Sequence, residues 1–474
     1  MRNSTDSIVM DGRGSLHQQL YRAMRALLLQ QLWPAGSMLP SSRQLATDLQ
    51  LSRNTVNQAL QQLVAEGYIH AVAAKGFIAT ELPETYFQPV PEDAQPAVAL
   101  SAYHYDLPVK MALVNGALQP GVPDIAAFAH RQWRQLLHRH SDRPGLHGFA
   151  EPTGYAPLRQ ALVAYLRQSR QVVCDEDNLL ITSGAQQALY ITACLVAQPG
   201  DTVLMENPGY PRLKQALQLR QLQIEHLDAG TPEGLDISQL PTRTKARALF
   251  LTPGHQYPLG GIMPLAQRLA VLDWAKQQQC WLIEDDYDSE YQYQHRPVAS
   301  LQGLAGGEGV LFCGSFSKTL FPALRLGYLV APKPVITQAA AIQQALQGDT
   351  PLLPQAVLAD FIREGHFGRH VRKMRRHYQI KKQLAVHYLQ QHLPQCRLFA
   401  CHAGLHLTLT FPVKLDEQAL LIQLRAQGIR AQPLSRYYFG AASHSGLVIG
   451  IANDKMPQAL QPLIRICQAA LADT

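Results

Sequence analysis

A helical pattern of apolar and polar positions runs through residues 16–32. The apolar side chains recur three or four positions apart, as on one face of an α-helix, and Pro34 and Gly36 then end the pattern. We therefore predict an amphipathic helix followed by a turn. Its buried stripe is expected to consist of Leu16, Leu20, Met24, Leu27 and Leu28.

Two further helices are predicted in the segment LPSSRQLATDLQLSRNTVNQALQQLVAEGYI. Ser41 can cap a short helix that ends at Leu49, and Ser52 can cap a longer one that ends at Glu66. Two capped helices separated by about three residues are typical of a helix-turn-helix. The buried stripe of the longer helix is expected to consist of Val56, Leu60, Leu63 and Val64.

The exposed N-terminal end of the longer helix carries side chains that suit phosphates and base edges. After Gly67, small and apolar residues in YIHAVAAKGFIATEL indicate a short hairpin with Lys75 and Gly76 at or near its tip. On periodicity alone, a small helical protein-interaction module explains these patterns as well as a DNA-binding head does. The candidate side chains at the helix end are Arg53, Asn54, Thr55, Asn57 and Gln58.

The segment that holds the two capped helices resembles the DNA-binding head of the GntR family of bacterial repressors almost position for position. The resemblance implies a winged helix-turn-helix that binds double-stranded promoter DNA. It implies that Arg43 and Arg53 contact DNA, that Thr55 lies at the major-groove end of the recognition helix, and that Gly76 brings the wing close to the DNA backbone. The wing AVAAKGF departs from the family pattern, because it has two alanines where such wings often carry a basic residue and glycine.

From Glu81 to Lys110 the composition changes to proline, with no sustained helical or strand period. We therefore expect a DNA-binding head at residues 12–81, a proline-rich linker at 82–110 and a second architecture at 111–474. A tether of this length spans on the order of 30 to 90 Å depending on its stiffness. The head consequently need not pack on its own chain.

Beyond the linker, strand-like apolar runs alternate with helical ones. This alternation predicts an α/β fold with a mainly parallel sheet that is covered by helices on both faces. A long basic helix is predicted around EGHFGRHVRKMRRHYQIKKQL, and its HVRKMRRHY run is interpreted as a solvated helix face rather than a second DNA patch. Short strands interleaved with helices after it predict a smaller α+β subdomain.

The segment ITSGAQQAL has the pattern of an anion site. It places Ser183, Gly184 and Ala185 between a predicted strand and a predicted helix. Free N–H groups and the positive end of the helix dipole would face an anion such as a phosphate there. Taken alone, the pattern is more simply a tight turn between a strand and a helix.

The segment GSFSKTLFPALRLGY sets Lys318 among Ser315 and Ser317, with Arg325 seven residues further on. A lysine in a sheltered pocket can lose its proton and form a Schiff base, and arginine offers two parallel donors to a phosphate. The alternative for a single lysine is ordinary solvation at the surface.

Two more segments contribute groups that suit a flat, charged ligand. In WLIEDDYDSEY a buried strand ends in acids beside Tyr287, and an ionised Asp285 there would need a cation such as a protonated ring nitrogen. In ENPGYPR, Tyr210 could stack on a planar ring and Arg212 could bind a carboxylate.

Together these residues match the fold-type I aminotransferases in order and spacing, and the complete chain resembles the MocR subfamily of GntR regulators, which joins such a body to such a head. The resemblance implies pyridoxal 5'-phosphate as the cofactor, held as a Schiff base (a lysine aldimine) on Lys318. It implies that Asp285 pairs with the pyridine nitrogen, Tyr287 bonds the ring oxygen and Tyr210 stacks on the ring. The TPGHQYPLGG segment matches the family's ring-facing loop, which makes His255 and Tyr257 further candidates. The phosphate would be surrounded by Ser183, Gly184, Ala185, Ser315, Ser317 and Arg325.

Two departures from the catalytic pattern bear on whether the body is an enzyme. Phe149 in FAEPTG stands where aminotransferases usually have a tyrosine that reaches the neighbouring subunit's phosphate, and Val448 stands where they typically have an arginine for the substrate carboxylate. We therefore expect a sensor of the cofactor, or of its adduct with an amino compound, that controls vitamin B6 or amino-compound metabolism. The alternatives are a working aminotransferase with an accessory head and a DNA-binding protein whose body only dimerises. Arg212, Arg430 and Arg436 are candidates for effector binding.

Composition adds few constraints to this picture. The formal charge of +7 permits a polyanionic partner, but residues 1–82 hold seven Lys and Arg against five Asp and Glu, so charge alone does not diagnose DNA binding. The seven cysteines form no CxxC pair, which favours free thiols and no metal site. With no long apolar stretch, we expect a soluble cytoplasmic protein. The family resemblance further implies a homodimer with exchanged heads.

Overall fold

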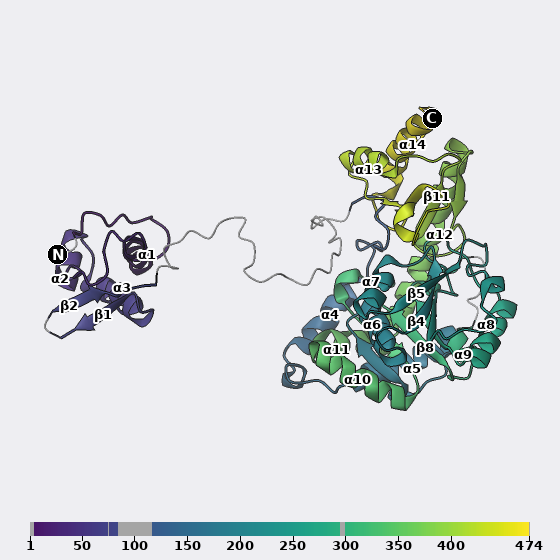
Figure 1. Ribbon diagram of the computed structural model, residues 1–474, viewed down its shortest axis with the longest axis horizontal. Helices are drawn as coiled ribbons and strands as arrows, with labels where there is room; N and C mark the ends of the chain where they lie inside the picture. The colour runs from purple at the N-terminus through teal and green to yellow at the C-terminus, as the bar shows by residue number, and fades with distance from the viewer. Residues whose placement is uncertain (1–3, 74, 84–115, 294–298, 474) are drawn as a thin grey trace. The chain divides into compact units, whose positions relative to one another are not determined.

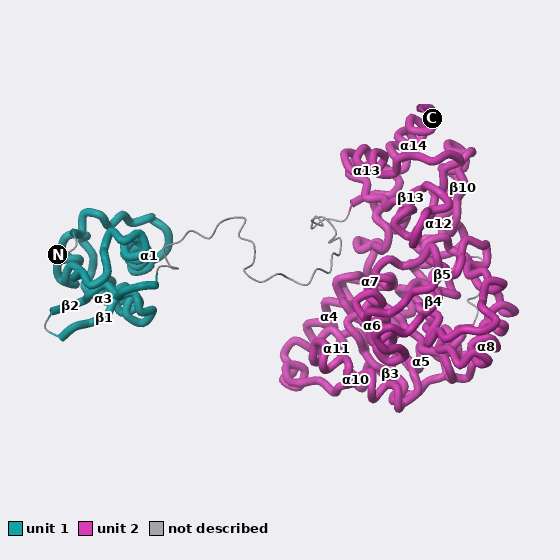
Figure 2. Tube along the Cα trace, in the orientation of Figure 1, with its two compact units in different colours: residues 1–104 teal, residues 105–474 magenta. Residues whose placement is uncertain are grey.

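The computed structural model describes residues 4–73, 75–83, 116–293 and 299–473. The chain forms two compact units, residues 1–104 and residues 105–474, which we call the head and the body (Figures 1 and 2). Most of the predicted linker at 82–110 lies outside the described residues, apart from Leu82 and Pro83.

The head has three helices followed by a hairpin. Its serine caps are formed as predicted: the Ser41 side chain accepts from the backbone N–H of Gln44 at 3.2 Å, and Ser52 accepts from that of Thr55 at 3.1 Å. The hairpin pairs Val72 with Gly76, so the predicted wing is present. The elements are α1 (Leu16–Leu29), α2 (Ser42–Asp48), α3 (Arg53–Ala65), β1 (Ile69–Val72) and β2 (Gly76–Ala79).

Most of the predicted stripe residues pack into one core of the head, but two predictions were wrong. Leu16 is 51% exposed, because it is the first residue of α1 and lies beyond the packed turns. Val64 is 37% exposed, because Ala59 completes the buried face of α3 and leaves Val64 at its edge.

In the described part of the body, seven strands form one sheet in the order β3-β9-β8-β7-β6-β4-β5. The neighbours from β8 through β5 run parallel, as predicted, whereas β9 runs antiparallel to both β3 and β8, so the sheet is mixed. The strands are β3 (Leu179–Thr182), β4 (Thr202–Asn207), β5 (Gln223–Asp228), β6 (Ala248–Leu251), β7 (Trp281–Asp286), β8 (Val310–Ser315) and β9 (Gly327–Val330).

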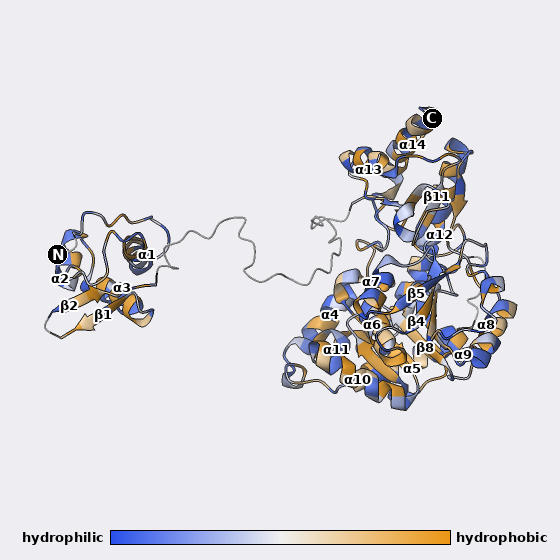
Figure 3. Ribbon diagram, in the orientation of Figure 1, coloured by the Kyte–Doolittle hydropathy of each residue, from blue (hydrophilic) through white to orange (hydrophobic). Residues whose placement is uncertain are grey.

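Helices cover both faces of this sheet, because successive strand residues point to opposite sides. Leu311 and Cys313 of β8 pack into the core that contains α6, while Phe312 between them packs into the core that contains α5 and α11. Figure 3 shows the central strands in the orange of apolar residues and more blue on the helices around them. The helices are α4 (His130–Ser141), α5 (Ala156–Arg170), α6 (Ala185–Val196), α7 (Pro211–Leu219), α8 (Leu265–Gln278), α9 (Leu301–Leu304), α10 (Lys333–Gln347) and α11 (Leu352–Arg363).

The C-terminal part of the body is the smaller α+β subdomain that the sequence predicts. Four strands form an antiparallel sheet in the order β10-β11-β13-β12, with its own apolar core. In the described part of the chain, no helix has both the length and the apolar character that crossing a membrane requires. The elements are α12 (His366–His392), β10 (Arg397–Phe399), β11 (His406–Thr410), α13 (Glu417–Ala426), β12 (Gln432–Pro433), β13 (Gly446–Gly450) and α14 (Met456–Ala472).

Candidate functional site

The candidate residues of the body gather at the carboxyl ends of its parallel strands. Tyr210 follows β4, His255 follows β6, Asp285 lies near the end of β7 and Lys318 follows β8. Loops at this edge of a parallel sheet are where ligands bind in α/β folds. Segments that are far apart in the sequence therefore contribute to one site.

Lys318 is partly buried, and its amine is held by the backbone. Its Nζ donates to the carbonyl of Gly121 at 2.8 Å. A Cβ on Gly121 would lie 2.7 Å from this Nζ, and Gly121 has a φ of +82°, so the backbone conformation and the close approach both favour glycine here. Burial, with a smaller contribution from the positive charge of Arg212, lowers the pKa of Lys318 to about 8 against the opposing charges of Asp288 and Asp285. At pH 7 roughly a tenth of the amine is consequently neutral and nucleophilic, far more than for an unperturbed lysine.

Asp285 differs from the acids on either side of it because side chains alternate along β7. Oε1 of Glu284 lies 3.9 Å from Nη1 of Arg268, and Asp286 accepts from Nε of Arg170 at 2.6 Å. Asp285 points to the other side, where its buried Oδ1 has no hydrogen-bond partner among the described residues. Burial raises the pKa of Asp285 to about 7. This carboxyl group is therefore suited to a positively charged partner that comes from outside the chain.

The N-terminus of α6 has the features of an anion site. Its N-cap, Gly184, has a φ of +99° and provides no side-chain cap for the first N–H groups of the helix. A Cβ on Gly184 would lie 3.7 Å from the guanidinium of Arg325, which places that cation beside the helix end. The hydroxyls of Ser183 and Ser315 accept from Nε2 of Gln347 and from the N–H of Ser317, at 2.7 and 3.1 Å.

Aromatic side chains line the space above Asp285. Tyr210 and Tyr257 lie with their rings 6.2 Å apart in an edge-to-face arrangement, and both line a pocket together with Asp285. The hydroxyls of Tyr257 and Tyr437 are 3.1 Å apart. Val448 packs in the same apolar cluster as Tyr437 and Tyr257. The position where aminotransferases typically have an arginine therefore lies against this tyrosine pair.

The three candidate effector arginines lie in different surroundings, and all are exposed. The charge of Arg212 acts on Tyr210 and Lys318, and that of Arg436 acts on Tyr257 and Tyr437. The stem of Arg430 instead lies against Gly116. The geometry therefore brings two of these arginines to the candidate site.

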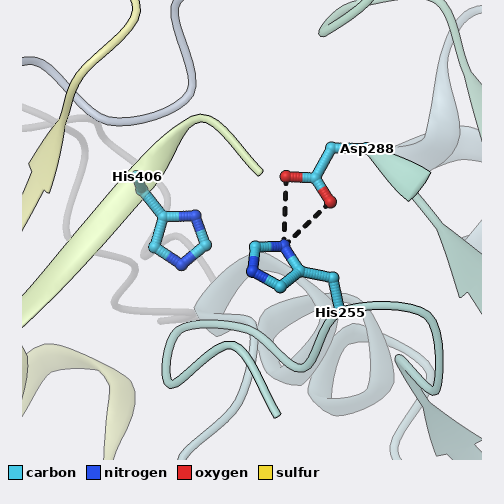
Figure 4. Close-up of side chains that lie close together, drawn as sticks. All are labelled: His255, Asp288 and His406. Atoms are coloured by element: carbon cyan, nitrogen blue, oxygen red, sulfur yellow. Dashed lines mark hydrogen bonds and ion pairs between the residues drawn. The ribbon is translucent and has the colours of Figure 1, made fainter. Parts of the chain in front are cut away.

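Three functional candidates were missed in the sequence. Glu206 is buried and accepts from the N–H and hydroxyl of Thr252, and burial raises its pKa to about 7. Asp288 accepts from Nδ1 of His255, and His406 lies beside that ring (Figure 4). Glu206 and Asp288 stand within motifs that were singled out, ENPGYPR and WLIEDDYDSEY, whereas His406 of β11 has no local signal.

His255, Asp288 and His406 place potential ligand atoms within 4.8 Å of one another. However, Nδ1 of His255 already bonds Asp288 at 3.0 Å, and Nε2 of His406 donates to the carbonyl of Pro258 at 2.9 Å. The arrangement is therefore a hydrogen-bonded acid–base group rather than a set of ligands around one point.

The candidate DNA-binding residues lie on the surface of the head. Thr55 is half-buried, with its hydroxyl 2.8 Å from that of the cap Ser52, and Gly76 opens β2 with a φ of +101°. The exposed members of the set are Arg43, Arg53, Asn54, Asn57, Lys75 and Gly76. In the body, Phe149 is fully exposed.

Comparisons with known proteins agree with both halves. Residues 16–78 match the gntR family of bacterial regulatory proteins, and residues 119–470 match aminotransferase class I and II. The chain is 35% identical over 449 residues to the probable rhizopine catabolism regulatory protein MocR of Rhizobium meliloti, covering 92% of this chain and 90% of that protein. It is 32% identical to the pyridoxine biosynthesis transcriptional regulator PdxR of Corynebacterium glutamicum, covering 93% and 92%.

Among solved structures, the body is similar to LysN, an α-aminoadipate aminotransferase from Thermus thermophilus in complex with N-(5'-phosphopyridoxyl)-L-leucine. The TM-score is 0.71 at 26% identity, covering 76% of this chain and 93% of that one.

Fold and site together define a winged helix-turn-helix regulator with an aminotransferase-like body. The chain belongs to the MocR subfamily of GntR transcriptional regulators.

Proposed function

We propose that the protein binds pyridoxal 5'-phosphate in its body and uses the binding to change how the head meets promoter DNA. In this proposal the body is a sensor of the cofactor, or of its adduct with an amino compound, rather than an enzyme. The observation that carries it is the buried carboxyl group of Asp285, whose Oδ1 has no partner among the described residues.

Asp285 fits the pyridine nitrogen of this cofactor. A carboxyl group whose pKa is raised to about 7 by burial is stabilised in its ionised form when a cation approaches. A protonated ring nitrogen supplies that cation, and Tyr210 on the same pocket offers an aromatic face to the ring. The acid and the aromatic ring thus recognise two properties of one planar group.

The remaining residues fit the aldehyde and the phosphate. The cofactor, when bound, supplies an aldehyde that reacts with primary amines and a ring that withdraws electrons. Lys318 offers an amine with a lowered pKa, and Tyr287 would bond the ring oxygen. The N–H groups at the start of α6 and the guanidinium of Arg325 would bind the phosphate. The serines beside them, with Gly184 and Ala185, complete the proposed set: Ser183, Ser315 and Ser317.

A sensor is favoured over an enzyme by the apolar surroundings of Val448. An arginine in that place would bind a substrate carboxylate, and losing one charge-assisted contact costs about 1.5–3 kcal/mol, or roughly tenfold to more than a hundredfold in affinity. Arg212 and Arg436 are the better placed substitutes, with Arg430 further from the site. The signal is therefore the cofactor itself or an amino compound that these arginines hold loosely.

We propose that residues 12–81 form the DNA-binding unit and residues 111–474 the effector unit, joined by the linker at 82–110. Arg43 and Lys75 would contact phosphates, while Arg53, Asn54, Thr55 and Asn57 would reach base edges and Gly76 would let the wing approach the duplex. A homodimer with exchanged heads would read two half-sites in the cytoplasm.

The test is an absorbance titration of the purified protein with pyridoxal phosphate, then with candidate amines, read alongside affinity for its own promoter. We expect a visible band in the wild type that is absent in Lys318→Ala, together with a changed footprint when the cofactor is added. Equal affinity and footprint with and without the cofactor would exclude the sensor. Robust multiple turnover with amino donors and 2-oxoglutarate or pyruvate would instead favour an aminotransferase.

A further inference from the structure

Two side chains lie within hydrogen-bonding distance of one nitrogen of His255, beside the candidate site. The hydroxyl of Tyr287 lies 3.0 Å from Nδ1 of His255, and that nitrogen lies 3.0 and 3.2 Å from the two carboxylate oxygens of Asp288. His255 and Asp288 are both almost fully buried, at 1% and 2% side-chain exposure. Figure 4 shows these two side chains pointing toward one another from separate segments.

A single nitrogen therefore faces two partners and can hold only one proton. A carboxylate can only accept, so a neutral His255 carries its hydrogen on Nδ1 and donates it to Asp288. The other tautomer would place a lone pair against the carboxylate and an N–H on Nε2, which has no acceptor among the described residues. With the hydrogen on Nδ1, this nitrogen cannot accept from Tyr287, and the phenolic hydrogen must point elsewhere.

We infer that Asp288 and His255 are positioning residues that hold Tyr287 as a hydrogen-bond donor toward the ring oxygen of the bound cofactor, and thereby set the proton affinity of that cofactor. The inference rests on the proposed binding of pyridoxal phosphate. Of these three residues, the family resemblance assigns a role to Tyr287 alone. Asp288 and His255 are added here, with the single hydrogen placed on Nδ1 of His255.

The backbone supports the pairing of His255 with Asp288. A Cβ on Gly404 would lie 2.1 Å from Cε1 of His255 and 2.5 Å from Oδ2 of Asp288, and Gly404 has a φ of +69°. Only glycine leaves room for the two side chains to meet. The ring of Tyr287 is also fixed by its neighbours. It stacks on the ring of His255, with 5.9 Å between the ring centroids, and meets the ring of Tyr257 edge-on, with 5.6 Å between the centroids.

The other titratable groups around the pair have partners or roles of their own. Burial holds the pKa of His406 well below its usual range, so this ring stays neutral and donates to the carbonyl of Pro258. The ammonium of Lys382 donates to three backbone carbonyls. The groups whose charges act on Tyr287, His406 or Lys318 from the surrounding elements are Asp285, Glu206, Tyr257, Arg212, Lys382 and Asp288, and Lys318 and His255 also act on His406.

The experiment follows the pH midpoint at which the visible band of the lysine-bound cofactor changes. A donor at the ring oxygen stabilises the deprotonated, more negative form of the bound cofactor, so losing the donor raises the midpoint. Tyr287→Phe removes the donor and should raise it by about one pH unit. His255→Phe, which frees the phenol, and Asp288→Leu, which removes the acceptor of the Nδ1 hydrogen and lets Nδ1 accept from the phenol, should each give at least half of that shift.

Two further variants separate positioning from general damage. His255→Asn can still present an N–H to Asp288, so it should restore a midpoint near that of the wild type. Tyr293→Phe removes a neighbouring phenol that donates to the carbonyl of Gly404 rather than to His255, and it should leave the effects of the His255 variants unchanged. In the double variant Tyr287→Phe/His255→Phe, the shift should not exceed that of Tyr287→Phe alone.

The inference fails if His255→Phe and Asp288→Leu keep the wild-type midpoint while Tyr287→Phe shifts it, or if the shifts of the double variant add. Failure of the proposed function has a different signature, because the wild type would then show no visible band with pyridoxal phosphate. A variant that does not fold is recognised by circular dichroism, and the other member of the pair then carries the test.

Discussion

Replacing Asp285 by Asn should make the cofactor-free protein more stable above neutral pH. Burial raises the pKa of this carboxyl group from 3.8 to about 7, so the folded chain binds its proton more tightly than the unfolded chain does. The loss of folding stability caused by ionising this buried carboxyl group is absent below pH 4, grows as the pH rises toward 7 and is complete above pH 7. A shift of about three pKa units corresponds to about 4 kcal/mol, which is an upper bound on the gain of Asp285→Asn at pH 8.

Urea unfolding of the cofactor-free protein at pH 5 and pH 8 measures this effect. Three of the four tryptophans, Trp133, Trp274 and Trp281, lie in the body, so fluorescence reports mainly on the unit that holds Asp285. We expect the stability gain of Asp285→Asn over the wild type to be less than half as large at pH 5 as at pH 8, because only about one of the three pKa units of cost has accumulated at pH 5. Pyridoxal phosphate should reverse the order, because only the wild type supplies an anion to the ring nitrogen.

Asp286→Asn is the matched control, one residue away on the same strand. Asp286 accepts from Arg170 at 2.6 Å with both side chains buried, so this variant should lose stability, because it leaves a buried cation without its ionised partner. The reasoning would be refuted if both variants lost stability equally at pH 8, since the two acids would then not differ in their need for a cation.

Three other variants test separate parts of the proposal. Gly121→Ala should weaken the visible band, because alanine is strained at a φ of +82° and its Cβ, 2.7 Å from Nζ of Lys318, would displace that amine; Gly145→Ala, where a Cβ meets no atom within 4 Å, is the control. Arg53→Ala should weaken binding to the promoter by about 1–3 kcal/mol in a mobility-shift assay, with an unchanged response of the body to the cofactor. Ser52→Ala removes the cap of α3 and should destabilise the head by about 1 kcal/mol, seen as a lower melting temperature of the head alone in calorimetry.

The sequence predicted those parts of the fold and site that depend on local patterns. Serine caps and helical spacing located α2 and α3 to within a residue or two, because capping is a property of four consecutive residues. The antiparallel direction of β9 was not predicted, because an apolar run has no direction until its neighbours are known. Asp285 could be found because acids at the end of a buried strand are unusual. The sequence could not show that Glu284 and Asp286 have arginine partners while Asp285 has none among the described residues, because Arg268 and Arg170 come from distant segments.

His406 shows the limit of that reasoning. It lies in β11 of the smaller subdomain, about 150 residues from His255 in the sequence. Its position beside His255 depends on how the smaller subdomain packs against the large sheet. A single histidine in an apolar strand gives no local signal of function. Lys382, whose amine reaches the carbonyls of Ala400, Ala403 and His406, is hidden in the same way within a helix that looks like a solvated basic surface.

The energetics of Asp285 also bear on the choice between sensor and enzyme. A ligand shifts a two-state equilibrium only by the difference in its binding free energy between the states. If only one conformation of the body brings Asp285 to the ring nitrogen, the buried charge is relieved in that conformation alone, and about 4 kcal/mol corresponds to a shift of roughly three orders of magnitude. A full change from 1:99 to 99:1 requires about 5.5 kcal/mol. In such a body, relief of the buried charge of Asp285 would supply at most about 4 of these 5.5 kcal/mol, without any contact to a substrate carboxylate.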